Sequence, residues 1–179
     1  MMELRTSLDH RPYESVYVHR ETTLDHPVEK VWPHALNIGG WMSAHQLETL
    51  AGEAGKVGHF ERVLPRGLGD DVPRPHYHLY GIAHLVPNKL IALEVLPEQG
   101  GSYGNTREWM SFDTILLTEL EGGRTRFTFM MIDVHMGKGE PEFHQKRKQE
   151  LEEVAGRLLA GYFENLRRLV AAGFKESPA

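Results

Sequence analysis

Residues 151 to 170 read LEEVAGRLLAGYFENLRRLV, and this stretch decides the fold. Its apolar residues recur every three or four positions, the spacing that places side chains on one face of an α-helix. The pattern starts after Gly139-Glu140-Pro141 and runs to Gly173. It predicts one helix of about 30 residues and about 45 Å, which needs an extended apolar surface to cover. The apolar stripe consists of Leu151, Val154, Ala155, Leu158, Leu159, Tyr162, Phe163, Leu166, Leu169 and Val170.

Strands predicted before this helix supply such a surface. Val16 to Leu24 alternates, with Val16, Val18, Arg20, Thr22 and Leu24 on one face. Short breaks rich in turn formers separate the later strands, at Pro87-Asn88, Gly100 to Asn105 and Glu121-Gly122-Gly123, and they indicate hairpins and antiparallel pairing. The strands after the first are predicted at 46–50, 56–64, 76–85, 89–96, 107–117 and 124–135.

A helix is predicted between the first and second strands. Asp25 is a candidate N-cap with Pro27 in the first turn, and Val31, Trp32 and Leu36 follow at helical spacing. Gly39-Gly40 is expected to end this helix, with Trp41 and Met42 in a short turn. Residues 66–75 are rich in Gly, Pro and acidic residues, which predicts a loop.

Composition excludes several classes of function. The chain of 179 residues has no cysteine, which rules out disulfides, thiolate metal sites and a cysteine nucleophile. Its 20 basic and 25 acidic residues give a net charge of -5, which argues against nucleic-acid binding. The basic run Lys146 to Lys148 is followed by Glu150, Glu152 and Glu153, so we interpret it as a solvated helix face.

Domain organisation and location are also indicated. We find no internal repeat and no linker, and we expect a single domain over residues 1–179 with a core at about 15–173. No stretch approaches the roughly 20 apolar residues of a membrane span, and Met1 to His10 lacks the apolar core of a signal peptide. We therefore expect a cytoplasmic protein. No motif reports its oligomeric state.

Several short motifs, in this order, carry a family resemblance. They are Leu24-Asp-His-Pro-Val-Glu-Lys-Val-Trp32, then Trp41, Val86-Pro-Asn-Lys-Leu90 and Gly122-Gly-Arg-Thr-Arg-Phe127. On them the chain resembles, over about residues 15 to 172, the START-like or Bet v 1-like (SRPBCC) superfamily, in particular its bacterial polyketide cyclase/dehydrase and lipid transport members. The resemblance implies an α+β helix-grip fold. In this fold a curved six- to seven-stranded antiparallel sheet wraps around a long C-terminal helix, two short helices follow the first strand, and an apolar ligand cavity lies between sheet and helix.

Candidate acid and base groups follow from strand alternation. If Phe127 and Phe129 point inward, as the resemblance implies, Met131, Asp133 and His135 share their face. Trp109, Ser111, Asp113 and Ile115 form the matching face of the neighbouring strand. Carboxylates in an apolar concavity have raised pKa values and can transfer protons, so Asp133, His135 and Asp113 are candidate catalytic residues. Two alternatives stay open: Asp133 and His135 lie in water at the strand end, or Asp113 pairs with an arginine such as Arg107.

Two further features have competing interpretations. His76, His78 and Tyr80 share one strand face, but no third ligand accompanies the histidines, so we predict no metal site and expect these side chains in solvent or at a cavity mouth. Gly156 and Gly161 lie inside the predicted long helix, where each costs about 1 kcal/mol relative to alanine. They allow close packing of the helix on the sheet, or they leave space for a ligand.

Three functions compete. The first is the binding of a hydrophobic or amphipathic small molecule, such as a lipid, polyketide or aromatic metabolite, in the cavity. The second, implied by the resemblance, is a cofactor-independent polyketide cyclase, aromatase or dehydratase that uses the Asp and His residues above. The third is a protein-interaction role like that of chaperone activators, marked by an exposed apolar patch on the outer sheet face. No cofactor is required by any of them. The candidate ligand-binding residues are Trp41, His78, Tyr80, Trp109, Phe112, Phe127, Phe129, Met131, Leu158, Leu159 and Tyr162.

Overall fold

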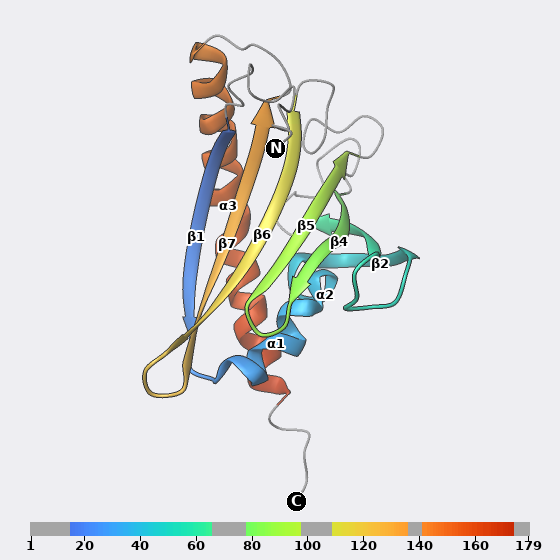
Figure 1. The fold of residues 1–179 in the computed structure, drawn as a ribbon, viewed down its shortest axis with the longest axis vertical. Coiled ribbons are helices and arrows are strands. Elements are labelled where there is room, and N and C mark those ends of the chain that lie inside the picture. The colour runs from blue at the N-terminus through green and yellow to red at the C-terminus, as the bar shows by residue number, and fades with distance from the viewer. Residues whose placement is uncertain (1–14, 66–77, 98–108, 136–140, 174–179) are drawn as a thin grey trace, which may run out of the picture.

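The computed structural model describes residues 15–65, 78–97, 109–135 and 141–173, which form one sheet and three helices (Figure 1). The seven strands are all antiparallel to their neighbours, in the order β1-β7-β6-β5-β4-β3-β2. The elements are β1 (Ser15–Leu24), α1 (Val28–Leu36), α2 (Ile38–Met42), β2 (Ser43–Ala51), β3 (Phe60–Pro65), β4 (His78–Val86), β5 (Leu90–Pro97), β6 (Trp109–Leu120), β7 (Arg124–His135) and α3 (Pro141–Ala172).

The sheet is held in register by its longest hairpin, β6–β7. Gly122 and Gly123 at its turn have φ values of 77° and 67°, a conformation that disfavours residues with a Cβ. Pairing then runs from Leu120 opposite Arg124 to Trp109 opposite His135. The hairpin expected from the sequence is confirmed, and it places the odd-numbered residues of both strands on the inner face.

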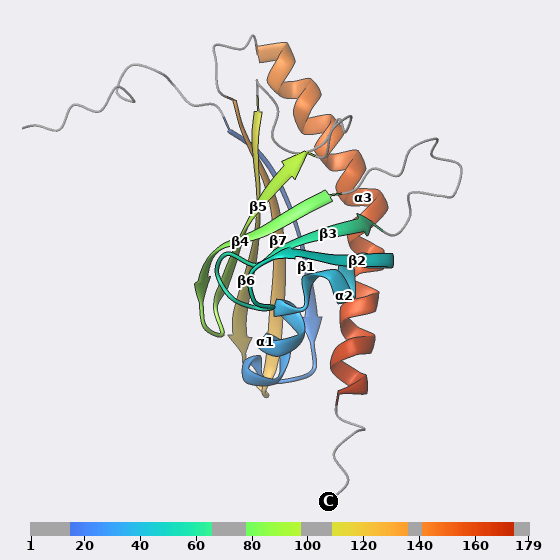
Figure 2. The same cartoon turned by 90° about the vertical axis from the view of Figure 1, so that its right-hand side faces the viewer.

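Helix α3 lies along the concave side of the sheet (Figure 2). It spans 32 residues, and its buried face is the predicted apolar stripe, with only Val154 and Leu169 partly exposed. Its main backbone contacts are with β1, α1 and α2. Side-chain bonds connect it to neighbouring elements at two points along its length, because Glu152 pairs with Arg20 of β1 at 2.5 Å and the Asn165 amide donates to the Trp41 carbonyl at 3.1 Å. The predicted helix-grip architecture is confirmed.

The segment after β1 differs from the prediction in its details. Helix α1 starts after Pro27, which is its N-cap and makes no side-chain cap bond, so the assignment of Asp25 as N-cap was wrong. Gly39 and Gly40 do not end a helix but lie within the short helix α2. The Gly39 backbone N–H donates to the buried Glu61 carboxylate at 3.0 Å. This tertiary contact stabilises α2 although glycine has a low helix propensity.

The third strand begins later than predicted. Residues 56–59 form a turn, in which the His59 N–H donates to the Lys56 carbonyl at 3.0 Å, and β3 starts at Phe60. Gly55 and Gly58 both have positive φ, at 73° and 84°, which suits a turn and not a strand. The loop predicted at 66–75, the break predicted at Gly100 to Asn105 and the residues Arg107 and His76 lie outside the described residues.

Gly156 and Gly161 lie on the solvent side of α3. A Cβ built at either position meets no atom within 4 Å. Both interpretations of these glycines, close packing on the sheet and space for a ligand, were therefore wrong. Their helical spacing relative to the buried residues decides this, because the apolar stripe faces the opposite way.

The helices among residues 15–65, 78–97, 109–135 and 141–173 include none that is long and apolar enough to cross a membrane.

Candidate functional site

Strand alternation on β6 and β7 brings the predicted acid and base residues inside the molecule. Asp113 and Asp133 are each 1% exposed and His135 is 6% exposed. In the register of the two strands, Asp113 lies opposite Met131 and Ser111 lies opposite Asp133. The alternative that Asp133 and His135 lie in water is therefore wrong. Two carboxyl groups thus lie on the inner face of the sheet, among the buried aromatic and aliphatic side chains Phe127, Phe129, Met131 and Ile115.

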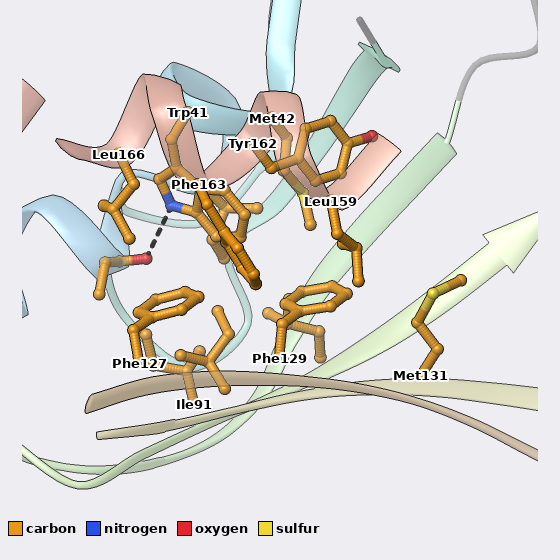
Figure 3. Close-up of a cluster of buried hydrophobic side chains, with 14 of the residues drawn as sticks. Trp41, Met42, Ile91, Phe127, Phe129, Met131, Leu159, Tyr162, Phe163 and Leu166 are labelled. Carbon is orange, nitrogen blue, oxygen red and sulfur yellow. Dashed lines mark hydrogen bonds between the residues drawn. The ribbon is translucent and has the colours of Figure 1, made fainter. Parts of the chain in front are cut away.

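A small cavity lies between this face and α3. It leaves about 10 Å³ for the centre of a water molecule, which is space for roughly one water. Figure 3 shows how its walls meet: Leu159 and Tyr162 project from α3 toward Phe129 and Met131 of β7. The lining residues are Tyr80, Asp113, Phe129, Met131, Val154, Leu158, Leu159 and Tyr162. Most of the predicted ligand-binding residues thus surround one space, together with Val154, which the helical stripe identified only as core.

Trp41 and Phe127 lie next to the cavity and do not line it. The Trp41 ring makes edge-to-face contacts with Phe127, Phe129 and Tyr162, at centroid distances of 5.6, 5.9 and 5.9 Å. Its indole N–H donates to the Ala35 carbonyl at 3.2 Å (Figure 3). Edge-to-face aromatic pairs contribute about 0.5–1.5 kcal/mol each beyond area burial, so Trp41 fixes the positions of Phe129 and Tyr162 in the cavity wall.

Asp113 is the carboxyl group that lines the cavity. Among the described residues it forms no ion pair, and neither of its oxygens has a hydrogen-bond partner of good geometry. Burial raises the pKa of Asp113 well above its usual value, the negative charge of Asp133 raises it further, and the Tyr80 hydroxyl acts in the opposite direction. The raised pKa keeps this carboxyl protonated to a higher pH than an ordinary aspartic acid, which suits it to donate a proton or a hydrogen bond.

Tyr162 faces the same cavity from α3. Its hydroxyl is buried and has no hydrogen-bond partner within the part of the chain that the structure describes. Burial, and then the nearby Asp113, raise the pKa of this phenol far above its usual value. Tyr162 therefore keeps its proton, and a polar O–H group is held in an apolar wall without a partner.

Asp133 has a partner that the sequence analysis missed. The Arg147 Nε donates to Asp133 Oδ2 at 2.5 Å, and the Arg147 side chain is only 11% exposed. Lys146 and Lys148 are exposed as predicted, but the interpretation of the whole basic run as a solvated face was wrong for Arg147. Helical spacing in the sequence indicates the buried position of Arg147, because Arg147 lies four residues before Leu151 and eight before Ala155 on the same stripe.

Two histidines complete this end of the site. His135 of β7 and His144 of α3 are both buried, with ring centroids 5.2 Å apart in an edge-to-face arrangement. No group of three potential metal-ligating side chains occurs among the described residues. The His135–His144 contact joins the end of β7 to the first turns of α3, the two elements that also carry Asp133 and Arg147.

A second buried polar group lies on β3. His59 Nε2 and Glu61 Oε1 are 2.6 Å apart, with side chains 1% and 7% exposed, and Glu61 also accepts the Gly39 N–H of α2. None of these residues lines the cavity. The pair connects β3 to α2 and so supports Trp41, which lies in that helix.

The remaining predicted residues are placed by the strands that carry them. His78 starts β4 opposite Pro97, and Trp109 starts β6 opposite His135, while their side chains lie outside the described part of the chain. Phe112 alternates with the buried Ser111 and Asp113, so it is half-buried on the outer face. Its assignment to the cavity was wrong, since a period of two cannot place adjacent residues on one face.

Comparison with known proteins supports the fold. No protein-family model matches the chain, and no curated protein sequence matches it. The chain is similar to the solved structure of the Zhui aromatase/cyclase from Streptomyces sp. R1128, with a TM-score of 0.61 and 15% identity over 88% of this chain and 94% of the other. The chain has the START-like, or Bet v 1-like, fold.

Two further structures of this fold are similar to the chain. Norcoclaurine synthase from Thalictrum flavum, in complex with dopamine and hydroxybenzaldehyde, has a TM-score of 0.63 at 14% identity, and the similarity covers 100% of this chain and 98% of the other. Ara h 8.0201 has a TM-score of 0.55 at 16% identity, over 89% and 99% of the two chains. At this level of identity the similarity establishes the fold, and the chemistry has to be argued from the site.

Proposed function

We propose that this protein binds a hydrophobic or amphipathic small molecule between the sheet and α3. The observation that carries the proposal is a cavity with apolar walls from β7 and α3 and with three polar groups, the Tyr80 and Tyr162 hydroxyls and the Asp113 carboxyl. Binding sites for small molecules have this composition, with mostly apolar walls and a few polar groups that orient the ligand. The similar structure of norcoclaurine synthase is a complex with dopamine and hydroxybenzaldehyde, two small aromatic molecules, which agrees with such a role.

The ligand has to widen the cavity, because the space present holds roughly one water. Helix α3 makes its main backbone contacts at the β1 edge and with α1 and α2. The cavity lies where Leu158 and Leu159 of α3 face Phe129 and Met131 of β7. Rotamer changes of Leu158 and Met131, or a small displacement of α3, would enlarge the site without breaking the sheet.

Native mass spectrometry of the purified protein tests the proposal, because a co-purified ligand adds a discrete mass that disappears on denaturation. Titration with a neutral fluorescent naphthalene probe gives the second readout. Val154→Phe adds a bulky group to the cavity wall and should weaken probe binding, whereas Glu153→Phe places the same group on the exposed side of α3 and should not. Equal effects of the two variants, together with bare protein in the mass spectrum, would contradict binding at this site.

A second candidate function is acid–base catalysis on the bound molecule. It is favoured by Asp113, a buried carboxyl with a raised pKa that lines the cavity. A group in this state can protonate a carbonyl or a leaving group, as a cofactor-independent cyclase or dehydratase requires. Turnover of the identified ligand that is abolished in Asp113→Asn, with binding retained, would establish it. Turnover that survives this change would remove Asp113 from the mechanism, and Asp133→Asn would then be the next variant to test.

A further inference from the structure

Two polar side chains in the cavity wall lack the partners that buried groups normally have. Asp113 is 1% exposed and Tyr162 is 2% exposed. The Tyr162 hydroxyl has no hydrogen-bond partner among the described residues, and the Asp113 carboxyl has only the nearby Tyr80 hydroxyl, outside regular hydrogen-bond geometry. A buried polar group without a partner costs about 1–3 kcal/mol, so two such groups on opposite walls of one cavity indicate that a ligand supplies the missing bonds.

The charges around Asp113 determine what it offers to that ligand. The negative charge of Asp133 of β7 acts on Asp113, and Arg147 of α3 pairs with Asp133. Tyr80 of β4 and Tyr162 of α3 are the other titratable groups that interact with Asp113. Asp113 thus has a carboxylate on one side, phenols on the others and no cation of its own among the described residues. An ionised carboxyl is disfavoured in these surroundings.

A neutral Asp113 and a neutral Tyr162 each present one O–H donor to the cavity. Because the Tyr80 hydroxyl approaches the Asp113 carboxyl, one of the two carboxyl oxygens can accept from Tyr80 while the other carries the proton. The remaining walls are aliphatic, aromatic or thioether side chains. The acceptor that matches two O–H donors is an oxygen with two lone pairs, as in a ketone or aldehyde.

Resting on the small-molecule binding proposed above, we propose that Asp113 and Tyr162 together hold a carbonyl oxygen of the ligand, each by donating one hydrogen bond. The substrate class is therefore a neutral carbonyl compound with an apolar body. A carboxylate ligand is disfavoured because it would lie near Asp133 without a cation, and an ammonium ligand is disfavoured because it requires Asp113 to ionise first.

The proposal predicts a pH dependence of definite sign. In the empty protein Asp113 holds its proton below its raised pKa and can donate to the carbonyl. As the pH rises through this pKa, the carboxylate that forms repels the carbonyl oxygen, so affinity for the carbonyl ligand falls. A ligand with an ammonium group would show the opposite trend, because it gains affinity when Asp113 ionises.

Calorimetric titration with three naphthalene probes of the same skeleton tests the proposal. Acetylnaphthalene carries a carbonyl, naphthylethylamine carries an ammonium group, and ethylnaphthalene carries neither. We expect acetylnaphthalene to bind roughly 10- to 100-fold more tightly than ethylnaphthalene, as two neutral hydrogen bonds provide. Its affinity should decrease as the pH rises through the raised pKa of Asp113. Tyr162→Phe should reduce the preference roughly 3- to 10-fold at every pH.

Asp113→Asn is the decisive control, because its amide N–H still donates and does not titrate. This variant should keep most of the preference for the carbonyl probe and lose the pH dependence. Tightest binding of the amine, with affinity rising with pH, would overturn the proposal. Equal binding of all three probes, unchanged in Tyr162→Phe and Asp113→Asn, would overturn it while leaving small-molecule binding intact. Failure of every probe to bind would refute both the carbonyl site and the underlying binding function.

Discussion

Replacing Arg147 with methionine removes the cation that neutralises Asp133 and leaves a carboxylate in the interior. The Nε–Oδ2 distance is 2.5 Å and the side chains are 11% and 1% exposed, so solvent screens the pair weakly. Breaking a buried ion pair from one side costs about 3–5 kcal/mol. We therefore expect Arg147→Met to lose about 4 kcal/mol of unfolding free energy, measured by urea denaturation followed by circular dichroism.

Replacing Asp133, the other member of the pair, should reduce the free energy of unfolding by less. In Asp133→Asn the Arg147 guanidinium is still paired with Glu150 at 3.2 Å and is still partly accessible to solvent. We therefore expect this variant to lose about 1–3 kcal/mol of unfolding free energy. The double variant should lose about 2 kcal/mol less than the sum of the two single losses, since one change removes the partner that the other leaves unpaired. Arg157→Met, on the exposed side of α3, is the matched control and should change stability by less than about 0.5 kcal/mol.

Two results would refute this reasoning. Equal costs for Arg147→Met and Arg157→Met would show that the buried pair contributes no more than a surface residue. Strict additivity of the Arg147 and Asp133 changes would show that the two side chains are not coupled. A spectroscopic readout is available as well: Asp133→Asn removes a negative charge that raises the pKa of Asp113, so NMR of the Asp113 carboxyl carbon should show a lower pKa.

Three other predictions follow from the packing of α3 and from Asp113. Gly156→Ala and Gly161→Ala should each stabilise the protein by up to about 1 kcal/mol, because neither new methyl group meets another atom. The expected rise in Tm, measured by scanning calorimetry, is roughly 2–4 °C. A lower Tm would mean that the new methyl group clashes with a neighbour. Leu158→Ala should lower the free energy of unfolding by about 2–5 kcal/mol and enlarge the cavity. Saturating ethylnaphthalene should restore part of this stability. No recovery would mean that neighbouring side chains rearrange to fill the new space. Since the pKa of Asp113 is raised above its ordinary 3.8, the folded chain retains a proton that the unfolded chain releases. The stability of the wild type relative to Asp113→Asn should therefore be highest at acid pH and fall as the pH rises from about 4 through the raised pKa. A stability difference that does not vary with pH would contradict a raised pKa.

Local patterns in the sequence were sufficient for the elements and for the orientation of their side chains. The stripe from Leu151 to Val170 gave the long helix, and strand alternation gave the inward placement of Asp113 and Asp133. Both are properties of a single element with a fixed period, which the order of apolar and polar residues displays directly. The same periods would also have placed Arg147 on the buried stripe and Phe112 on the outer face.

The tertiary structure alone decided how the elements meet. The Asp133–Arg147 pair joins a strand to a helix, the Glu61 bond to Gly39 joins a strand to a short helix, and the cavity depends on the position of α3 above β7. Each is set by the packing of side chains from several elements, in which a shift of about 1 Å makes or breaks a hydrogen bond or fills a cavity. Periodicity fixes the direction in which a side chain points, and only the packed molecule determines what it reaches.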